Sequence, residues 1–71
     1  MVNIRDLSRF ESGSTVDPAI LIQSGLVSGR YDGVKLLGNG DIDYPLSIRL
    51  HRISQSARQK IEAAGGTVEE I

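Results

Sequence analysis

The chain has 71 residues, a net charge of −1 at pH 7 and no cysteine. This length allows one domain with a single small core, and 39% hydrophobic with 24% charged residues is typical of an ordinary soluble chain. Without cysteine there is no disulfide framework, thiol nucleophile or zinc–thiolate site, which fits a reducing compartment. We find no secretory signal and no apolar run long enough to cross a membrane, so we expect no membrane partner.

The first fifteen residues are expected to form a strand, one helical turn and a loop. Residues 2–4 alternate in polarity and can start a strand. Asp6 is expected to be the N-cap of a single turn that places Leu7 and Phe10 on one face, with Phe10 as a core anchor. The composition of residues 11–15 is typical of a loop.

The first clear helix begins at Asp17 and Pro18. Asp17 is expected to cap it, and proline is well suited to the first helical position because that residue needs no N–H donor. Gly25 is expected to end the helix in a left-handed conformation, with Leu26 folded back onto Leu21. Because the helix is apolar on most sides, we expect neighbouring elements to clamp it.

The middle of the chain predicts two further strands. Residues 28–33 are expected to form a loop, and residues 34–37 favour a strand that ends in a tight turn at Gly38-Asn39-Gly40. Residues 46–51 alternate over six positions, which is the strongest strand pattern in the chain. This alternation directs Leu46, Ile48 and Leu50 to one face and Ser47, Arg49 and His51 to the other.

A second helix and a closing strand are expected at the C-terminal end. Ser54 is a suitable N-cap for a helix over residues 55–64. Gly65-Gly66 is expected to end this helix, and residues 67–71 can return as a strand. The narrow apolar stripe of the helix consists of Ala57, Ile61 and Ala64.

The patterns that resemble chemical sites in the second half lack essential members. Asn39, Asp41 and Asp43 imitate the start of a calcium loop, but its sixth and twelfth positions are Tyr44 and Leu50 instead of glycine and glutamate. The glycines at 38 and 40 are followed by acids, which would repel a phosphate. We therefore expect no metal, no cofactor and no small-molecule substrate.

The single histidine, His51, is the one candidate general base near neutral pH. Its spacing supplies no nucleophile and no orienting acid, so we predict that the chain is not an enzyme. An enzymatic alternative would pair His51 with Asp41 or Asp43, and it requires all three side chains in one cleft.

One segment carries a local excess of positive charge. No acid lies between Asp43 and Glu62, whereas this interval holds Arg49, Arg52, Arg58 and Lys60, with His51 beside them. Arg58 and Lys60 lie off the apolar stripe of their helix and are expected to be solvated. A chain of low net charge can still present one basic face, although these residues can also be ordinary solvated charges.

Residues 35–65 resemble the signature of a known family. The matching pattern is a lysine, two aliphatic residues and a small residue, then a glycine and an aliphatic residue, alternating aliphatics, an aliphatic–serine pair, and spaced alanine, isoleucine and glycine. These positions are Lys35-Leu36-Leu37-Gly38, Gly40, Ile42, Leu46, Ile48, Ile53-Ser54, Ala57, Ile61 and Gly65. The pattern is similar to the C-terminal globular domain of the universal, bacterial-type large-subunit ribosomal protein family numbered fifteen, and the resemblance extends over the whole chain.

This resemblance implies an α/β fold, namely one small domain over residues 1–71 built from irregular β-β-α superhelical turns with short capped helices. It implies a structural constituent of the large ribosomal subunit that supports assembly and translation in cytoplasmic ribosomes, with an organellar ribosome as the alternative. The implied partners are 23S-type rRNA and neighbouring ribosomal proteins. Members of this family carry a basic N-terminal arm, and we expect that arm to be missing from this chain.

The candidate residues fall into two groups under this interpretation. The expected rRNA contacts are Arg49, Arg52, Arg58, Lys60 and His51, which would meet phosphates and sugars without identifying bases. The signature residues are expected to be mainly structural; they are Lys35, Gly38, Gly40, Ser54, Ala57, Ile61 and Gly65. The alternative function is a protein–protein docking module without direct RNA contact.

Overall fold

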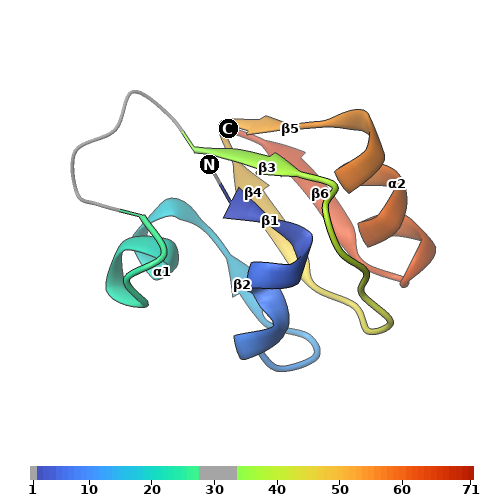
Figure 1. The fold of residues 1–71 in the computed structure, drawn as a ribbon, viewed down its shortest axis with the longest axis horizontal. Helices are drawn as coiled ribbons and strands as arrows, with labels where there is room; N and C mark the ends of the chain where they lie inside the picture. Colours follow the sequence, from blue (N-terminus) through green and yellow to red (C-terminus); the bar gives the residue numbers. More distant parts are fainter. Residues whose placement is uncertain (1, 28–33) are drawn as a thin grey trace.

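Six short strands, two α-helices and one 3₁₀ helix make up the part of the chain that the computed structural model describes, residues 2–27 and 34–71 (Figure 1). In chain order these are β1 (Val2–Asn3), the 3₁₀ helix η1 (Ile4–Arg9), β2 (Thr15–Val16), α1 (Pro18–Gln23), β3 (Lys35–Leu37), β4 (Ser47–Leu50), β5 (Arg52–Ile53), α2 (Gln55–Ala63) and β6 (Thr67–Glu70). None of the helices in these residues has the length and apolar character to span a membrane. The loop predicted at residues 28–33 lies outside the described residues.

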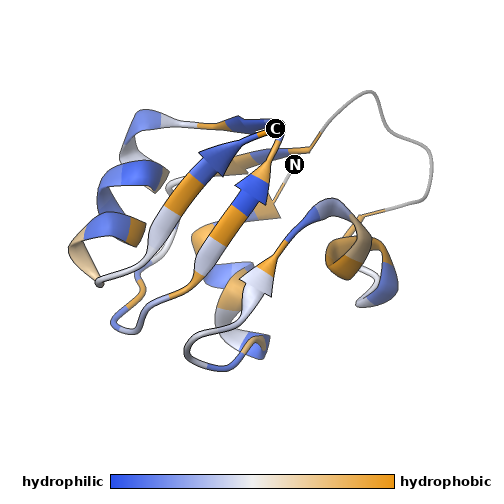
Figure 2. Ribbon diagram, turned by 180° about the vertical axis from the view of Figure 1, so that it is seen from behind, coloured by the Kyte–Doolittle hydropathy of each residue, from blue (hydrophilic) through white to orange (hydrophobic). Residues whose placement is uncertain are grey.

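The strands alternate between two parallel sheets as the chain advances. One sheet has the order β1-β3-β5 and the other β2-β4-β6, so each of the six strands belongs to a different sheet from the strand before it, and α2 lies between β5 and β6 in the chain. Figure 1 shows the first sheet in front, and Figure 2 shows the second from behind. Because the chain passes from sheet to sheet in successive turns, the arrangement is the expected superhelical α/β fold, and this prediction is confirmed.

The core fills the space between these two sheets. Each sheet contributes one register row of inward-facing apolar side chains, Val2–Leu36–Ile53 in the first and Val16–Ile48–Val68 in the second. The predicted alternation of residues 46–51 is confirmed, since Leu46, Ile48 and Leu50 are buried. The other buried members of the core are Ile4, Leu7, Leu21, Val34, Ala57 and Ile61.

The predicted helix boundaries are confirmed by the hydrogen bonds at each end. The Ile20 N–H donates to Asp17 Oδ1 at 2.8 Å, and the Ala57 N–H donates to Ser54 Oγ at 3.2 Å. At the end of α1, Gly25 has φ +83°, and the Leu26 N–H reaches back to the Leu21 carbonyl at 3.0 Å. A glycine in this conformation satisfies the last carbonyls of a helix without steric cost.

The prediction for Asp6 was wrong. The N-cap is Asn3, three residues earlier, so the helix begins at Ile4 and Asp6 lies in its first turn, where Oδ2 accepts the Asn3 N–H at 2.9 Å. The reason is the core: a 3₁₀ helix repeats every three residues, and this repeat buries both Ile4 and Leu7. Phe10, at the end of the helix, is half-buried and packs against the core.

The expectation that α1 is clamped between neighbours was also wrong. Among its residues only Leu21 is fully buried, whereas Ile22 is 36% exposed, Ala19 is exposed and Ile20 is only half-buried. The helix lies beside the sheets instead of between them (Figure 1). A helix of two turns that touches the core with one side leaves its other apolar residues at the surface.

Candidate nucleic-acid interface

The first two glycines of the signature allow close approach of the backbone. A Cβ at Gly38 would collide with the Ser56 hydroxyl and lie 3.1 Å from the Ala57 nitrogen at the start of α2. Gly40 has φ +105°, and a Cβ there would lie 2.7 Å from the Arg5 nitrogen. The tight turn was expected at Gly38-Asn39-Gly40 because glycine permits positive φ, and of these two glycines Gly40 has a positive φ in the structure.

Lys60 holds this turn against the second helix. Its Nζ donates to the Gly38 carbonyl at 2.7 Å and to the Gly40 carbonyl, and it lies 3.5 Å from Asp41 Oδ1. The side chain lies off the buried stripe, as expected, but it is not simply solvated. An ammonium group with three donors can bridge two carbonyls and a carboxylate, so Lys60 stabilises the loop from Gly38 to Asp41.

Two arginines of the basic segment, Arg49 and Arg58, each have an acidic partner on β6. Arg49 Nε lies 3.4 Å from Glu69 Oε2, and Arg58 Nη2 lies 3.0 Å from Glu70 Oε1. Arg49 and Glu69 are direct register partners of the parallel strands β4 and β6. The basic segment of the sequence is therefore partly neutralised in the folded chain, because acids of β6 lie beside two of its arginines.

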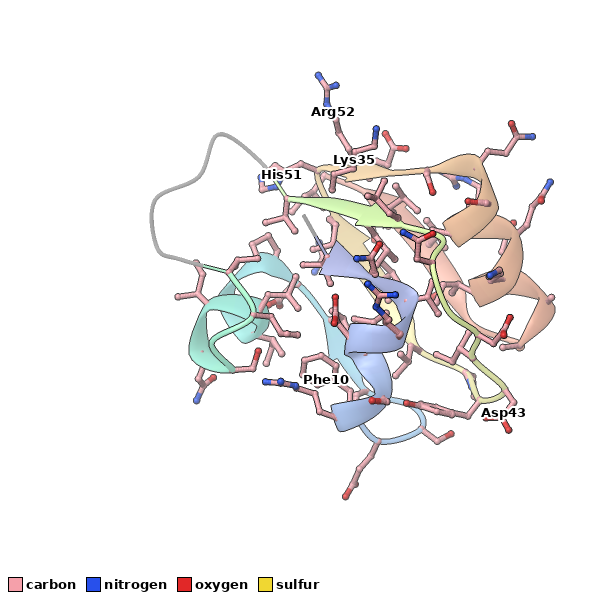
Figure 3. The ribbon with its side chains drawn as sticks, in the orientation of Figure 1. Phe10, Lys35, Asp43, His51 and Arg52 are labelled. Atoms are coloured by element: carbon pink, nitrogen blue, oxygen red, sulfur yellow. The ribbon has the colours of Figure 1, made fainter. Side chains whose placement is uncertain are left out.

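Arg52 lies in a different electrostatic environment. It faces Lys35 directly across β5 and β3, and both side chains are exposed. Figure 3 shows the two side chains next to each other at this edge of the β1-β3-β5 sheet. Among the described residues, no acid lies within ion-pair distance of either cation. Lys35 was expected to be mainly structural, yet it makes no described side-chain hydrogen bond.

His51 forms the corner between β4 and β5. Its Nδ1 accepts the Val34 N–H at 3.2 Å, which holds the start of β3 against this corner. Asp43 lies at the opposite end of the molecule in Figure 3, and Asp41 lies beside Lys60. The three side chains of the enzymatic alternative do not share a cleft, and in the described part of the chain no group of acids and histidine can hold a metal.

The outer face of the second sheet is polar and nearly neutral. One register row consists of hydroxyl side chains, Thr15, Ser47 and Thr67, and another row holds the Arg49–Glu69 ion pair. Figure 2 shows that no helix covers this face. The two sheets therefore differ in the charge that they present, because the excess of positive charge lies at the β3–β5 edge.

Sequence reasoning missed the acidic partners of the arginines. The consecutive acids Glu69 and Glu70 in the expected closing strand were visible in the sequence. Their pairing depends on which strand lies beside β6, and no local pattern gives this. Among the remaining signature residues, Ser54 caps α2, Ala57 and Ile61 are buried, and Gly65 has φ +87°.

Comparison with known proteins gives consistent matches along the chain. Residues 1–69 match the family model that describes the ribosomal proteins 50S-L15 and 50S-L18e together with a 60S ribosomal protein. The large ribosomal subunit protein uL15 of Desulfosudis oleivorans is 63% identical over 71 residues, which are 100% of this chain and 48% of that protein. The uL15 protein of Syntrophotalea carbinolica is 57% identical over 72 residues, which cover 100% of this chain and 49% of that protein. The chain thus spans about half the length of the curated relatives that it matches.

Proposed function

The chain belongs to the family of the ribosomal proteins 50S-L15 and 50S-L18e, and we propose on this basis that it is a structural, non-enzymatic constituent of the large ribosomal subunit. In this role it binds 23S-type rRNA and neighbouring ribosomal proteins and supports subunit assembly and translation in cytoplasmic ribosomes. The observation that carries the proposal is the family match over residues 1–69, together with relatives that are named as large-subunit proteins.

The RNA contacts in this proposal are electrostatic. Arg49, Arg52, Arg58 and Lys60, with His51, meet phosphates and sugars and fix the orientation of the domain on the RNA. The ion pairs of Arg49 and Arg58 do not prevent this, because both partners are exposed and a surface ion pair contributes only about 0–1 kcal/mol. A phosphate can therefore replace a carboxylate at little cost.

Base stacking has no support among the described aromatic residues. Phe10 packs against the core, and the Tyr44 hydroxyl donates to the Leu7 carbonyl at 3.2 Å. A single-strand binding surface needs exposed aromatic faces. Recognition of the shape and backbone of folded RNA fits these residues better.

Binding to a large-subunit rRNA transcript, measured against salt concentration, tests the proposal. The wild type is compared with a variant that reverses three charges, Arg49→Glu, Arg52→Glu and Arg58→Glu. Lys60 is left intact because it holds the Gly38–Asp41 loop. We expect the logarithm of the wild-type affinity to fall linearly with the logarithm of the salt concentration. The variant is expected to bind more weakly, and its affinity should depend less steeply on salt.

The alternative of a protein–protein docking module has one observation in its favour, since Arg49, Arg58 and Lys60 already have acidic partners. It predicts that wild type and variant show the same weak, salt-insensitive interaction with the transcript. That outcome would refute the RNA contacts. Circular dichroism of both proteins serves as the control that the charge reversals leave the fold intact.

A further inference from the structure

Two cations lie directly opposite each other at one edge of the β1-β3-β5 sheet. Lys35 on β3 and Arg52 on β5 are register partners, and β5 is the edge strand of this sheet. Neighbouring strands are about 4.8 Å apart, so two exposed side chains at this position emerge from the sheet close together. Figure 3 shows both extending away from the core on the same side. We call these two residues the Lys35–Arg52 pair.

The pair is electrostatically unfavourable within the chain itself. Like charges directly opposite each other on adjacent strands destabilise a sheet. Elsewhere in the molecule, Arg49 and Arg58 each have an acid within 3.4 Å, and Arg9 donates from Nη1 to the Ser24 carbonyl. No described acid compensates the Lys35–Arg52 pair in this way. An anion from outside the chain would remove the repulsion and would gain from both charges.

We propose that the Lys35–Arg52 pair is the principal phosphate-binding site of this domain, with the backbone of large-subunit rRNA as its ligand. This inference rests on the proposed function, and it identifies the two cations that contribute most to the proposed RNA binding. An arginine can bind a phosphate through two parallel N–H donors, and a lysine adds a mobile point charge beside it. The pair has no described intramolecular ion pair to break before it binds, whereas Arg49 and Arg58 must first release Glu69 and Glu70.

Two double variants that remove the same charge test this assignment. The first neutralises the pair with Lys35→Gln and Arg52→Gln, and the second neutralises the ion-paired arginines with Arg49→Gln and Arg58→Gln. Both lower the net charge by two, so a difference between them reports the position of the charge. Each is titrated against the same large-subunit rRNA transcript at several salt concentrations, and thermal unfolding of each protein is followed by circular dichroism.

We expect the first variant to lose the larger share of RNA affinity. Each phosphate contact contributes about 0.7–0.9 to the slope of log affinity against log salt, so losing two contacts lowers the slope by about 1.4–1.8. Between about 50 and 200 mM salt, this slope accounts for roughly a tenfold change in affinity. The second variant is expected to change the slope by less than half as much. The melting temperature of the first variant should be unchanged or higher, because a repulsion has been removed.

The outcomes separate this assignment from the proposed function. If the first variant binds like the wild type, or if the second variant loses more affinity than the first, the assignment is refuted while rRNA binding stands. If the wild type shows no salt-dependent binding, both are refuted. Polyglutamate is titrated as a second ligand, and an affinity for it that equals the RNA affinity and depends on the pair would also overturn the assignment to phosphate.

Discussion

Replacing Gly66 with alanine perturbs a close approach between the turn that follows α2 and the backbone of Leu46. A Cβ at this position would collide with the Leu46 carbonyl oxygen and lie 2.9 Å from both the Leu46 nitrogen and Ile61 Cγ2. Leu46 and Ile61 are buried, so neither can move aside freely. The same carbonyl accepts the Thr67 N–H at 3.0 Å, which starts the pairing of β6 with β4.

The expected loss of stability follows from these contacts. Overpacking of a filled core costs about 1–3 kcal/mol. Weakening the Thr67–Leu46 hydrogen bond adds about 0.5–1.5 kcal/mol. We therefore expect Gly66→Ala to lower the free energy of unfolding by about 1.5–4.5 kcal/mol, the sum of the ranges for overpacking and hydrogen bonding. At about 0.05–0.15 kcal/mol per residue, this chain has roughly 4–10 kcal/mol in total, so the loss is a large fraction.

The neighbouring glycine provides a matched control. Gly65 has φ +87°, but its nearest neighbour for a Cβ is Pro45 Cβ at 4.0 Å, so Gly65→Ala encounters backbone strain alone. That strain costs about 1–2 kcal/mol. Gly13→Ala, with φ +85° and no atom within 4 Å, calibrates the same strain at a second site.

Urea unfolding followed by circular dichroism measures all three variants under one set of conditions. The expected order of destabilisation places Gly66→Ala above Gly65→Ala and Gly13→Ala, which should be similar to each other. The reasoning would be refuted if Gly66→Ala unfolded at the same urea concentration as the wild type, or if Gly65→Ala were the more damaging substitution.

Three further substitutions test individual contacts by the same unfolding assay. Lys60→Met removes the bonds to the Gly38–Asp41 loop and should cost about 1 kcal/mol, a value reduced for the partial exposure of the side chain; wild-type stability would contradict the role of this lysine. Ser54→Ala removes the N-cap of α2 and should cost about 0.5–2 kcal/mol, whereas Gln55→Ala at the exposed neighbour should change stability by less than about 0.5 kcal/mol. Ile61→Ala creates a cavity in the core and should cost about 2–5 kcal/mol; a smaller loss would mean that the core collapses around the site.

Local sequence patterns determined the elements whose formation depends on near neighbours in the chain. Asp17 and Ser54 predicted the starts of both helices because a capping side chain bonds to an N–H three residues later. Alternation predicted β4 with its correct inward face, and Gly25 predicted the end of α1. The pattern over residues 35–65 also indicated the family, since it records the glycines and core positions that this fold requires.

The tertiary structure alone decided which distant residues lie side by side. The parallel register of β4 and β6 brings Glu69 to Arg49, and the register of β3 and β5 brings Lys35 to Arg52. The contact of Lys60 with the Gly38 carbonyl and the exposure of α1 depend in the same way on packing between separate elements. A local pattern specifies which face of a strand is buried, but it does not specify which strand is its neighbour. The sequence therefore located the basic segment, and the fold determined which of its charges are already neutralised within the chain.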